Sequence, residues 1–183
     1  MSNEYDVVVI GSGPAGYVAA IRCAQLGFKT ACIEKWLNKA DKTVFGGTCL
    51  NVGCIPSKAL LDSSHKYIDA QNHFEVHGIS VGKVVMDVPA MMSRKDKVVD
   101  QLTSGIKGLF TANKVDGLSG TGKIAGANKV VVTDKDGKQQ ELVAKHIIIA
   151  AGSVPIDILL PQSIMKLLST RPGHWSFRKC LNV

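Results

Sequence analysis

Composition and charge limit the kinds of protein that this chain can be. Its 183 residues are 45% apolar and 20% charged, which is ordinary for a globular domain with a buried core. The net charge of +7 is uneven, because residues 159–183 hold four basic side chains and no acidic one. The rest of the chain carries 18 basic and 15 acidic side chains, a balance too mild to indicate a nucleic-acid partner.

The N-terminal residues and the cysteines indicate a compartment. No apolar run reaches the ~18 residues that span a bilayer, and residues 1–5 lack the basic and then apolar pattern of a signal peptide. The five cysteines show no spacing typical of a secreted disulfide framework. We therefore expect a cytoplasmic protein with no membrane partner.

The chain begins with the pattern of a dinucleotide-binding unit. Residues 6–10 are Asp6 followed by an apolar run without alternation, typical of a parallel strand buried on both faces. A glycine turn at 11–16, a helix and a second strand at 30–34 follow. The glycines allow backbone amides to approach a pyrophosphate at the helix N-terminus, and the Glu34 carboxylate can accept hydrogen bonds from ribose hydroxyls. This order predicts an α/β, Rossmann-like domain.

Residues 46–58, Gly-Gly-Thr-Cys-Leu-Asn-Val-Gly-Cys-Ile-Pro-Ser-Lys, suit a redox-active disulfide. A regular helix turns about 100° per residue, so the side chains of Cys49 and Cys54 would point roughly 140° apart on one. The pair therefore requires a distorted turn, which Gly53 and Pro56 make available before a helix from Ser57 to about residue 70. On that helix Lys58 shares the face of Cys54 and can favour the thiolate over the thiol.

Two other interpretations of these cysteines stay open. Buried structural cysteines are common in intracellular proteins, and we expect that role for Cys23, on a helix face, and Cys32, in a strand. Zinc binding is the more specific alternative. Cys49 and Cys54 are, however, farther apart in the sequence than usual zinc ligands, and no second pair of ligands accompanies them. We expect no metal site.

The second half of the chain predicts a long helix and then strands. The helix begins near Pro89, with Asp87 just ahead of it. An apolar stripe at helical spacing is expected to pack in the core: Met91, Val98, Val99, Leu102, Ile106, Leu109 and Phe110. Residues 130–133 and 141–143, joined by a turn at 134–137, predict an antiparallel hairpin, and 146–150 a buried strand. We expect a parallel sheet with helices plus a small antiparallel β-meander.

With these residues in view, the chain resembles the flavin-dependent disulfide reductases, from about residue 5 to residue 158. Residues 46–58, extended by Ala59-Leu60-Leu61, look more like the dihydrolipoyl dehydrogenase branch than like glutathione or mercuric reductase, although all share the Cys-x-x-x-x-Cys core. The resemblance implies FAD as the bound dinucleotide. Family members usually carry Thr or Ser where this chain has Ala151, which puts one FAD contact in doubt.

The resemblance also implies roles for individual residues. Cys49, Cys54 and Lys58 would be catalytic. The expected cofactor-binding residues lie in the glycine loop, at the end of the second strand, in the cysteine motif and in the later strands: Gly11, Ser12, Gly13, Pro14, Ala15, Gly16, Glu34, Lys35, Gly47, Thr48, Cys49, Lys58, Gly122, Ala151, Gly152 and Ser153.

The activity that the resemblance implies is the oxidation of dihydrolipoamide to lipoamide, with NAD as the final acceptor. Dihydrolipoamide would attack Cys49, Cys54 would leave as a thiolate beside the flavin, and electrons would pass through FAD to NAD. The implied partners are the lipoyl domains of 2-oxo acid dehydrogenase complexes and a second copy in a homodimer. The family's NAD-binding domain, interface domain and His-Glu pair have no counterpart in this sequence, so an inactive flavin-binding remnant is the alternative expectation.

Residues 159–183 depart from the family pattern. Pro161, Pro172 and Gly173 interrupt any amphipathic period. With permitted codons, a reading frame one base upstream can encode a segment beginning Ala-Pro-Ala-Val-Asp-His-Glu, which resembles the family's continuation. We therefore expect a FAD-binding domain over 1–158, incomplete relative to the family. The tail over 159–183 would then be a disordered product of a frameshift.

Overall fold

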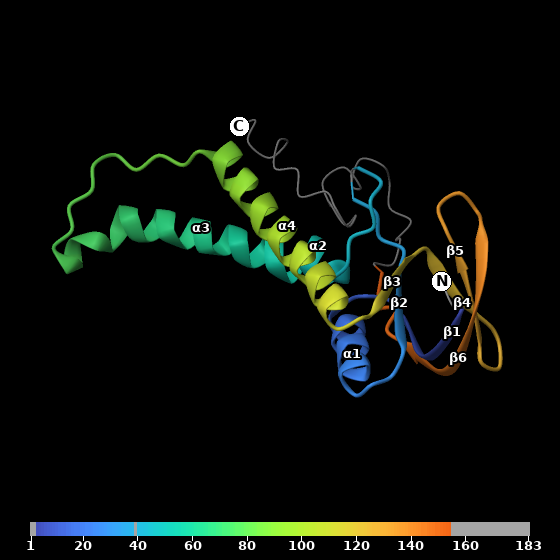
Figure 1. Ribbon diagram of the computed structural model, residues 1–183. Coiled ribbons are helices and arrows are strands. Elements are labelled where there is room, and N and C mark those ends of the chain that lie inside the picture. The colour runs from blue at the N-terminus through green and yellow to red at the C-terminus, as the bar shows by residue number, and fades with distance from the viewer. Residues whose placement is uncertain (1–2, 39, 155–183) are drawn as a thin grey trace.

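The computed structural model describes residues 3–38 and 40–154 (Figure 1). The expected tail, with its proposed frameshift and disorder, lies outside the described residues. The elements are, in chain order, β1 (Glu4–Ile10), α1 (Pro14–Gln25), β2 (Thr30–Glu34), α2 (Gly47–Asn51), α3 (Cys54–Asn72), the 3₁₀ helix η1 (Phe74–His77), α4 (Val88–Ala112), β3 (Asp116–Ser119), β4 (Thr121–Gly126), β5 (Lys129–Thr133) and β6 (Gln139–Ile149). Among the described helices, none has the length and hydropathy needed to cross a bilayer.

The six strands form one mixed sheet in the order β3-β2-β1-β6-β5-β4. Strands β3, β2, β1 and β6 are parallel, whereas β5 pairs antiparallel with both β6 and β4. The hairpin and the later strand that the sequence predicted as separate are joined in β6. Its first half pairs with β5 and its second half with β1. The predicted β-meander is therefore continuous with the parallel sheet.

Strand β1 is buried on both faces, as its unbroken apolar run predicted. Val7 and Val9 belong to a cluster with residues of the helices, including Ala20 of α1 and Phe110 of α4. Val8 faces the opposite way. Its cluster combines the parallel strands with the antiparallel ones and contains Tyr5, Ala31, Ile33, Val130, Val132, Leu142 and Ala144. The two clusters hold the end of β1, and hence the glycine loop after it, in a fixed position.

Helix α4 begins as predicted but packs in the core only near its end. The Asp87 carboxylate accepts a hydrogen bond from the Ala90 amide at 2.9 Å and so caps the helix. Ile106 and Phe110 are buried, but Leu102 and Leu109 are 40% and 47% exposed, so the expectation of core packing is wrong for these two. The first turns of α4 extend beyond the sheet beside α3 (Figure 1), where the chain offers less surface to cover them.

Candidate active site

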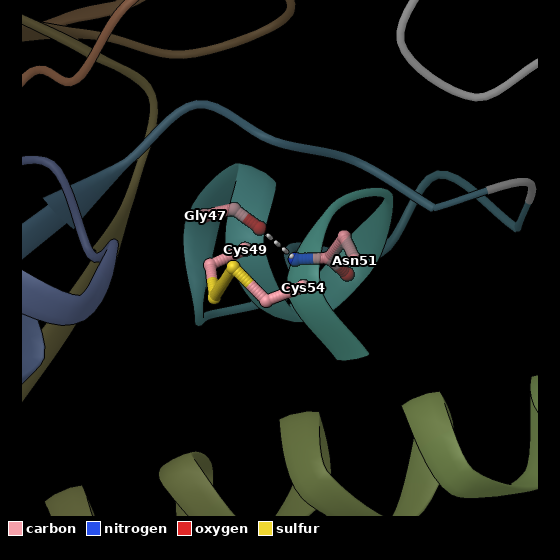
Figure 2. Close-up of a disulfide and its surroundings, with 4 residues drawn as sticks. All are labelled: Gly47, Cys49, Asn51 and Cys54. Carbon is pink, nitrogen blue, oxygen red and sulfur yellow. Dashed lines mark hydrogen bonds between the residues drawn. A yellow bond between two sulfur atoms is a disulfide. The ribbon is translucent and has the colours of Figure 1, made fainter. Parts of the chain in front are cut away.

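Cys49 and Cys54 are joined in a disulfide between two helices (Figure 2). Their Cα atoms lie 4.7 Å apart, within the range that a disulfide spans. Cys49 lies inside α2, and Cys54 is the first residue of α3. Between them Val52 and Gly53 leave the helical conformation, which confirms the predicted distorted turn. Helix α3 begins three residues before the predicted start, so the distortion lies ahead of Cys54 rather than after it.

Gly53 allows the two helices to approach closely. A side-chain carbon added at Gly53 would lie 3.0 Å from the Thr48 carbonyl oxygen and 3.3 Å from the Cys49 Cα. Asn51 closes the same turn, because its side-chain amide donates a hydrogen bond to the Gly47 carbonyl at 2.9 Å (Figure 2). The sequence analysis missed Asn51, whose signal was a side chain able to bond to the backbone within the cysteine motif.

The glycine loop forms a tight turn into α1. A side-chain carbon added at Gly16 would lie 1.8 Å from the Gly11 carbonyl oxygen, so only glycine fits there. Helix α1 starts at Pro14, and its N-cap Gly13 provides no side-chain hydrogen bond to the first amides. An added carbon at Gly13 would meet nothing within 4 Å. Uncapped amides beside open space at a helix start suit an anionic phosphate group.

The cysteine motif contacts this loop directly. The Gly46 amide donates to the Ser12 carbonyl at 3.0 Å and lies 3.1 Å from the Ser12 hydroxyl oxygen. A side-chain carbon added at Gly47 would lie 2.7 Å from the Gly13 Cα. Ser12 itself is fully buried. The structure therefore brings together two motifs that the sequence separates by about thirty residues.

Glu34 takes part in the same buried contact. Its carboxylate is 7% exposed and accepts hydrogen bonds from the Ser12 hydroxyl at 2.6 Å, the Ser12 amide at 3.1 Å and the Trp36 amide at 2.9 Å. A buried carboxylate needs such partners, and the sequence analysis did not foresee them. A carboxylate has about four acceptor positions, so one is left for another donor such as a ribose hydroxyl.

The other expected site residues lie around this centre. Lys35 follows Glu34 on the surface, beside a hollow of about 80 Å³. Gly122 in β4 lies over the ends of β1 and β2, since an added carbon would be 3.0 Å from Ile33 and 3.3 Å from Ile10. Residues 151–153 follow β6 and are exposed. Thr48 and Lys58 are also exposed, and Lys58 lies one turn after Cys54 on α3.

The remaining described cysteines occupy apolar surroundings. Cys32 is fully buried, and its thiol lies 3.6 Å from the Gly11 carbonyl oxygen. Burial, with a smaller contribution from the Glu34 charge, raises the pKa of Cys32 to about 12. Cys23 is partly buried against the helix-side cluster, so both positions agree with core packing. Cys180 lies outside the described residues. Within residues 3–38 and 40–154, no group of three or more His, Cys, Asp or Glu side chains is arranged to hold a metal ion.

The chain is similar to curated proteins of known activity. It is 55% identical over 152 residues to the mitochondrial dihydrolipoyl dehydrogenase of Pisum sativum and to the mitochondrial dihydrolipoyl dehydrogenase 1 of Arabidopsis thaliana. Each match covers 83% of this chain and 29% of the relative. It is also 54% identical over 152 residues to the leghemoglobin reductase of Glycine max, covering 83% of this chain and 28% of that protein. The chain thus spans less than a third of the length of the relatives it matches.

The expected cytoplasmic location is wrong. The relatives from Pisum sativum and Arabidopsis thaliana are named as mitochondrial, which points to the mitochondrion instead. The signal-peptide test concerns secretion and does not detect a mitochondrial transit peptide, which is amphipathic and rich in arginine. It therefore gave no reason to choose the cytoplasm over the mitochondrion.

A family model described as "Pyridine nucleotide-disulphide oxidoreductase" matches residues 5–176, most of the chain. Membership implies FAD as the cofactor, with NAD as the co-substrate of the full-length family enzymes. The uncapped start of α1, the open space at Gly13 and the remaining acceptor position of Glu34 are consistent with bound FAD. The six-stranded α/β sheet is likewise that of a Rossmann-like FAD-binding domain. The chain therefore belongs to the pyridine nucleotide-disulphide oxidoreductase family.

Proposed function

We propose that this chain carries the FAD-binding and dithiol-exchange part of an enzyme that oxidises dihydrolipoamide to lipoamide, with NAD as the final acceptor. The main support is the contact between the Cys49–Cys54 turn and the glycine loop through Gly46 and Ser12. It puts a disulfide next to the helix start that suits a dinucleotide. The names of the relatives in Pisum sativum and Arabidopsis thaliana supply the substrate class.

The proposed exchange has two steps. A thiolate of dihydrolipoamide attacks the Cys49 sulfur, which forms a mixed disulfide and releases Cys54 as a thiolate. The second substrate thiolate then attacks the substrate sulfur of that mixed disulfide, which closes lipoamide and releases Cys49. The substrate loses two electrons, and the protein disulfide gains them. Of the two substrate protons, one goes to Cys49 and the other to solvent.

The helix geometry supports attack at Cys49 rather than at Cys54. Cys54 is the first residue of the 19-residue helix α3, where the helix dipole stabilises an anion. Lys58, one turn later, adds a positive charge on the same face. Cys49 lies inside the five-residue helix α2 and has neither advantage. Because the better-stabilised thiolate leaves faster, Cys54 is the expected leaving group.

FAD, when bound, supplies the acceptor that takes the electron pair from the dithiol and delivers it to NAD. The residues proposed to hold FAD keep the roles inferred from the resemblance. The amides at the start of α1 would bind the pyrophosphate, Glu34 the ribose and the Gly122 backbone the adenine end. Thr48 and Lys58 would hold the flavin end. Ala151 contributes backbone contacts alone, because it has no hydroxyl.

The relatives have further regions that this chain does not match. We propose the remaining parts of the activity for a protein that contains those regions as well. These parts are NAD-linked turnover, the His-Glu pair, the homodimer and the docking of lipoyl domains. For the 183 residues alone we expect the exchange reaction without NAD-linked turnover. The boundary of the FAD-binding domain at residue 158 stays a prediction, and the family match extends beyond it to residue 176.

Flavin absorbance tests the proposal. The purified chain is incubated with FAD, freed of excess cofactor and reduced with dihydrolipoamide. We expect bound flavin and a long-wavelength band from the Cys54 thiolate, which Cys54→Ser abolishes and Cys49→Ser retains. Equal loss in both variants would contradict the assigned roles. Bound flavin with no response of the disulfide to dihydrolipoamide would instead favour a flavin-binding module without exchange activity.

A further inference from the structure

Asn51 stabilises helix α2, which carries Cys49 ahead of the turn between the two cysteines. It is the last residue of that helix and is half-buried. Its side-chain amide donates to the carbonyl of Gly47, the first residue of the helix, at 2.9 Å (Figure 2). Two backbone bonds run in the same direction, from the Leu50 amide to the Gly46 carbonyl at 3.4 Å and from the Val52 amide to the Thr48 carbonyl at 3.0 Å. Since a helix of five residues has few backbone bonds of its own, the Asn51 side chain adds to the small number of bonds that close it.

The disulfide adds a side-chain link between α2 and α3 to the two-residue backbone connection through Val52 and Gly53. Between these helices Val52 and Gly53 have non-helical backbone angles, so no continuous helix would maintain the distance between the sulfurs after reduction. At its other end α2 is anchored, because the Gly46 amide is bonded to Ser12. Once the disulfide opens, the position of Cys49 therefore depends on whether α2 stays closed behind that anchor.

We infer that Asn51 is a positioning residue, whose side-chain amide keeps α2 closed in the dithiol state and holds Cys49 within reach of Cys54. The inference rests on the proposed function, since it concerns the reduced form of the proposed redox pair. Asn51 donates its side-chain hydrogen bond to the Gly47 carbonyl and so acts on Cys49 through the backbone of α2.

A pre-positioned dithiol loses less conformational entropy when it closes to a disulfide. Removing the Asn51 bond frees α2 in the reduced state, whereas the disulfide still restrains it in the oxidised state. A net hydrogen bond of about 1 kcal/mol corresponds to about a fivefold weaker tendency to close the disulfide. That change raises the reduction potential of the pair by about 20 mV.

The chain offers a matched control. The Asn113 side-chain amide donates to the Leu109 carbonyl at 2.8 Å, the same bond over the same four-residue spacing, at the end of α4. It also offers a guide to a rescue variant. Ser63 and Thr103 donate their hydroxyls to carbonyls four residues earlier, Ala59 and Val99, at 3.2 and 3.0 Å. Asn51→Ser can make the same bond to Gly47, and Asn51→Leu keeps the bulk of Asn51 without a donor.

The experiment equilibrates the full chain, without FAD, in mixtures of oxidised and reduced dithiothreitol. Alkylation and peptide mapping then give the fraction of Cys49–Cys54 disulfide. We expect Asn51→Ala and Asn51→Leu to weaken the disulfide about fivefold, Asn51→Ser to come within about twofold of wild type, and Asn113→Ala to have no effect.

Each other outcome contradicts the inference. A wild-type potential in both Asn51→Ala and Asn51→Leu would show that the bond does not position Cys49. Asn51→Ser matching Asn51→Ala would show that the donor is not the cause, and an equal shift in Asn113→Ala would indicate a general loss of stability. If Asn51→Ala does not fold, the comparison is made between Asn51→Leu and Asn51→Ser.

The same experiment separates this inference from the proposed function. A wild-type chain with no reversible disulfide would contradict both. A reversible wild-type disulfide with unshifted variants would contradict this inference alone.

Discussion

The glycine loop contacts two cysteine regions that differ in almost every physical respect. On one side, strand β2 places Cys32 in the core, fully buried, with its thiol 3.6 Å from the Gly11 carbonyl oxygen. On the other side, Gly46 at the start of α2 bonds to Ser12, and the turn after α2 leaves Cys54 exposed. Burial raises the pKa of Cys32 to about 12, whereas Cys54 begins a long helix that favours an anion.

This difference shows that position decides which thiols near a dinucleotide loop can react. A thiol in the sheet packs as a small apolar side chain. Because no water surrounds it, its reactive thiolate form is disfavoured. A thiol at a helix start, on a turn opened by Gly53, can change its oxidation state without disturbing the core. Both regions contact the same glycine loop through different residues. Each region can therefore be altered separately and the effects compared.

The largest expected effect comes from altering the glycine loop that the two regions share. Gly16→Ala places a carbon 1.8 Å from the Gly11 carbonyl oxygen, so we expect a loss of about 3 kcal/mol in the free energy of unfolding. Gly13→Ala is the control, because its added carbon meets nothing within 4 Å and its φ of −64° is ordinary. We expect it to cost a few tenths of a kcal/mol while weakening FAD binding. Urea denaturation and flavin titration check both, and equal stability of the two variants would contradict the tight turn.

The second prediction compares the thiols directly. After reduction of the chain, we expect Cys54 to react with iodoacetamide at pH 8 at least about a hundredfold faster than Cys32. A thiol with a pKa of about 12 is rarely ionised there, and its anion is covered by the core. Time-resolved alkylation with peptide mapping measures both rates, and Cys23 provides an intermediate, partly buried case. Similar rates for Cys32 and Cys54 would remove the contrast between the regions.

The third prediction concerns Glu34, the buried acid that accepts hydrogen bonds from Ser12 of the glycine loop. Glu34→Gln keeps the volume but sets an amide donor among the three donors from Ser12 and Trp36. We expect it to cost about 2 kcal/mol in the free energy of unfolding. Glu141→Gln removes an exposed ion pair with Lys129 and should cost less than about 0.5 kcal/mol. Equal losses in urea denaturation would mean that burial of Glu34 has no special consequence.

The smallest effect depends on pH. Burial, then the hydrogen bond and charge of Asp116, raise the pKa of Tyr5 from 10 to about 12. The folded chain therefore holds this proton more tightly than the unfolded chain, and the stabilisation is complete below pH 10 and lost as the pH rises through 12. By pH 11 we expect a loss of about 1.4 kcal/mol that Tyr5→Phe does not show. Because Cys32 titrates in the same range, the measurement is the difference between wild type and Tyr5→Phe, and parallel curves for the two would contradict it.

The features that could be predicted from the sequence are those in which local chemistry allows one solution. The apolar run at 7–10 had to be buried on both faces, and the spacing of Cys49 and Cys54 required a break in the helix. Asp87 and Pro89 marked the start of α4, which the structure places at Val88. Each of these follows from the residues themselves, without knowledge of what packs against them.

The features that could not be predicted depend on contacts between distant segments. Strand β3, Asp116–Ser119, contains no β-branched residue and becomes a strand because it pairs with β2. The turn of Glu34 toward Ser12 depends on burial that only the folded chain provides. Leu102 matches the apolar stripe of α4 but is 40% exposed, although Thr103 next to it is buried. Periodicity reports which face is apolar and does not report whether anything covers it.

Peptide mapping of the chain before and after treatment with dihydrolipoamide tests the central claim most directly. We predict that the air-oxidised chain gives a peptide in which Cys49 and Cys54 are joined to each other, with Cys23 and Cys32 free. Dihydrolipoamide should open that link and form one lipoamide per chain. Free alkylation of Cys49 and Cys54 in the oxidised chain, or a link that dihydrolipoamide leaves intact, would contradict the account.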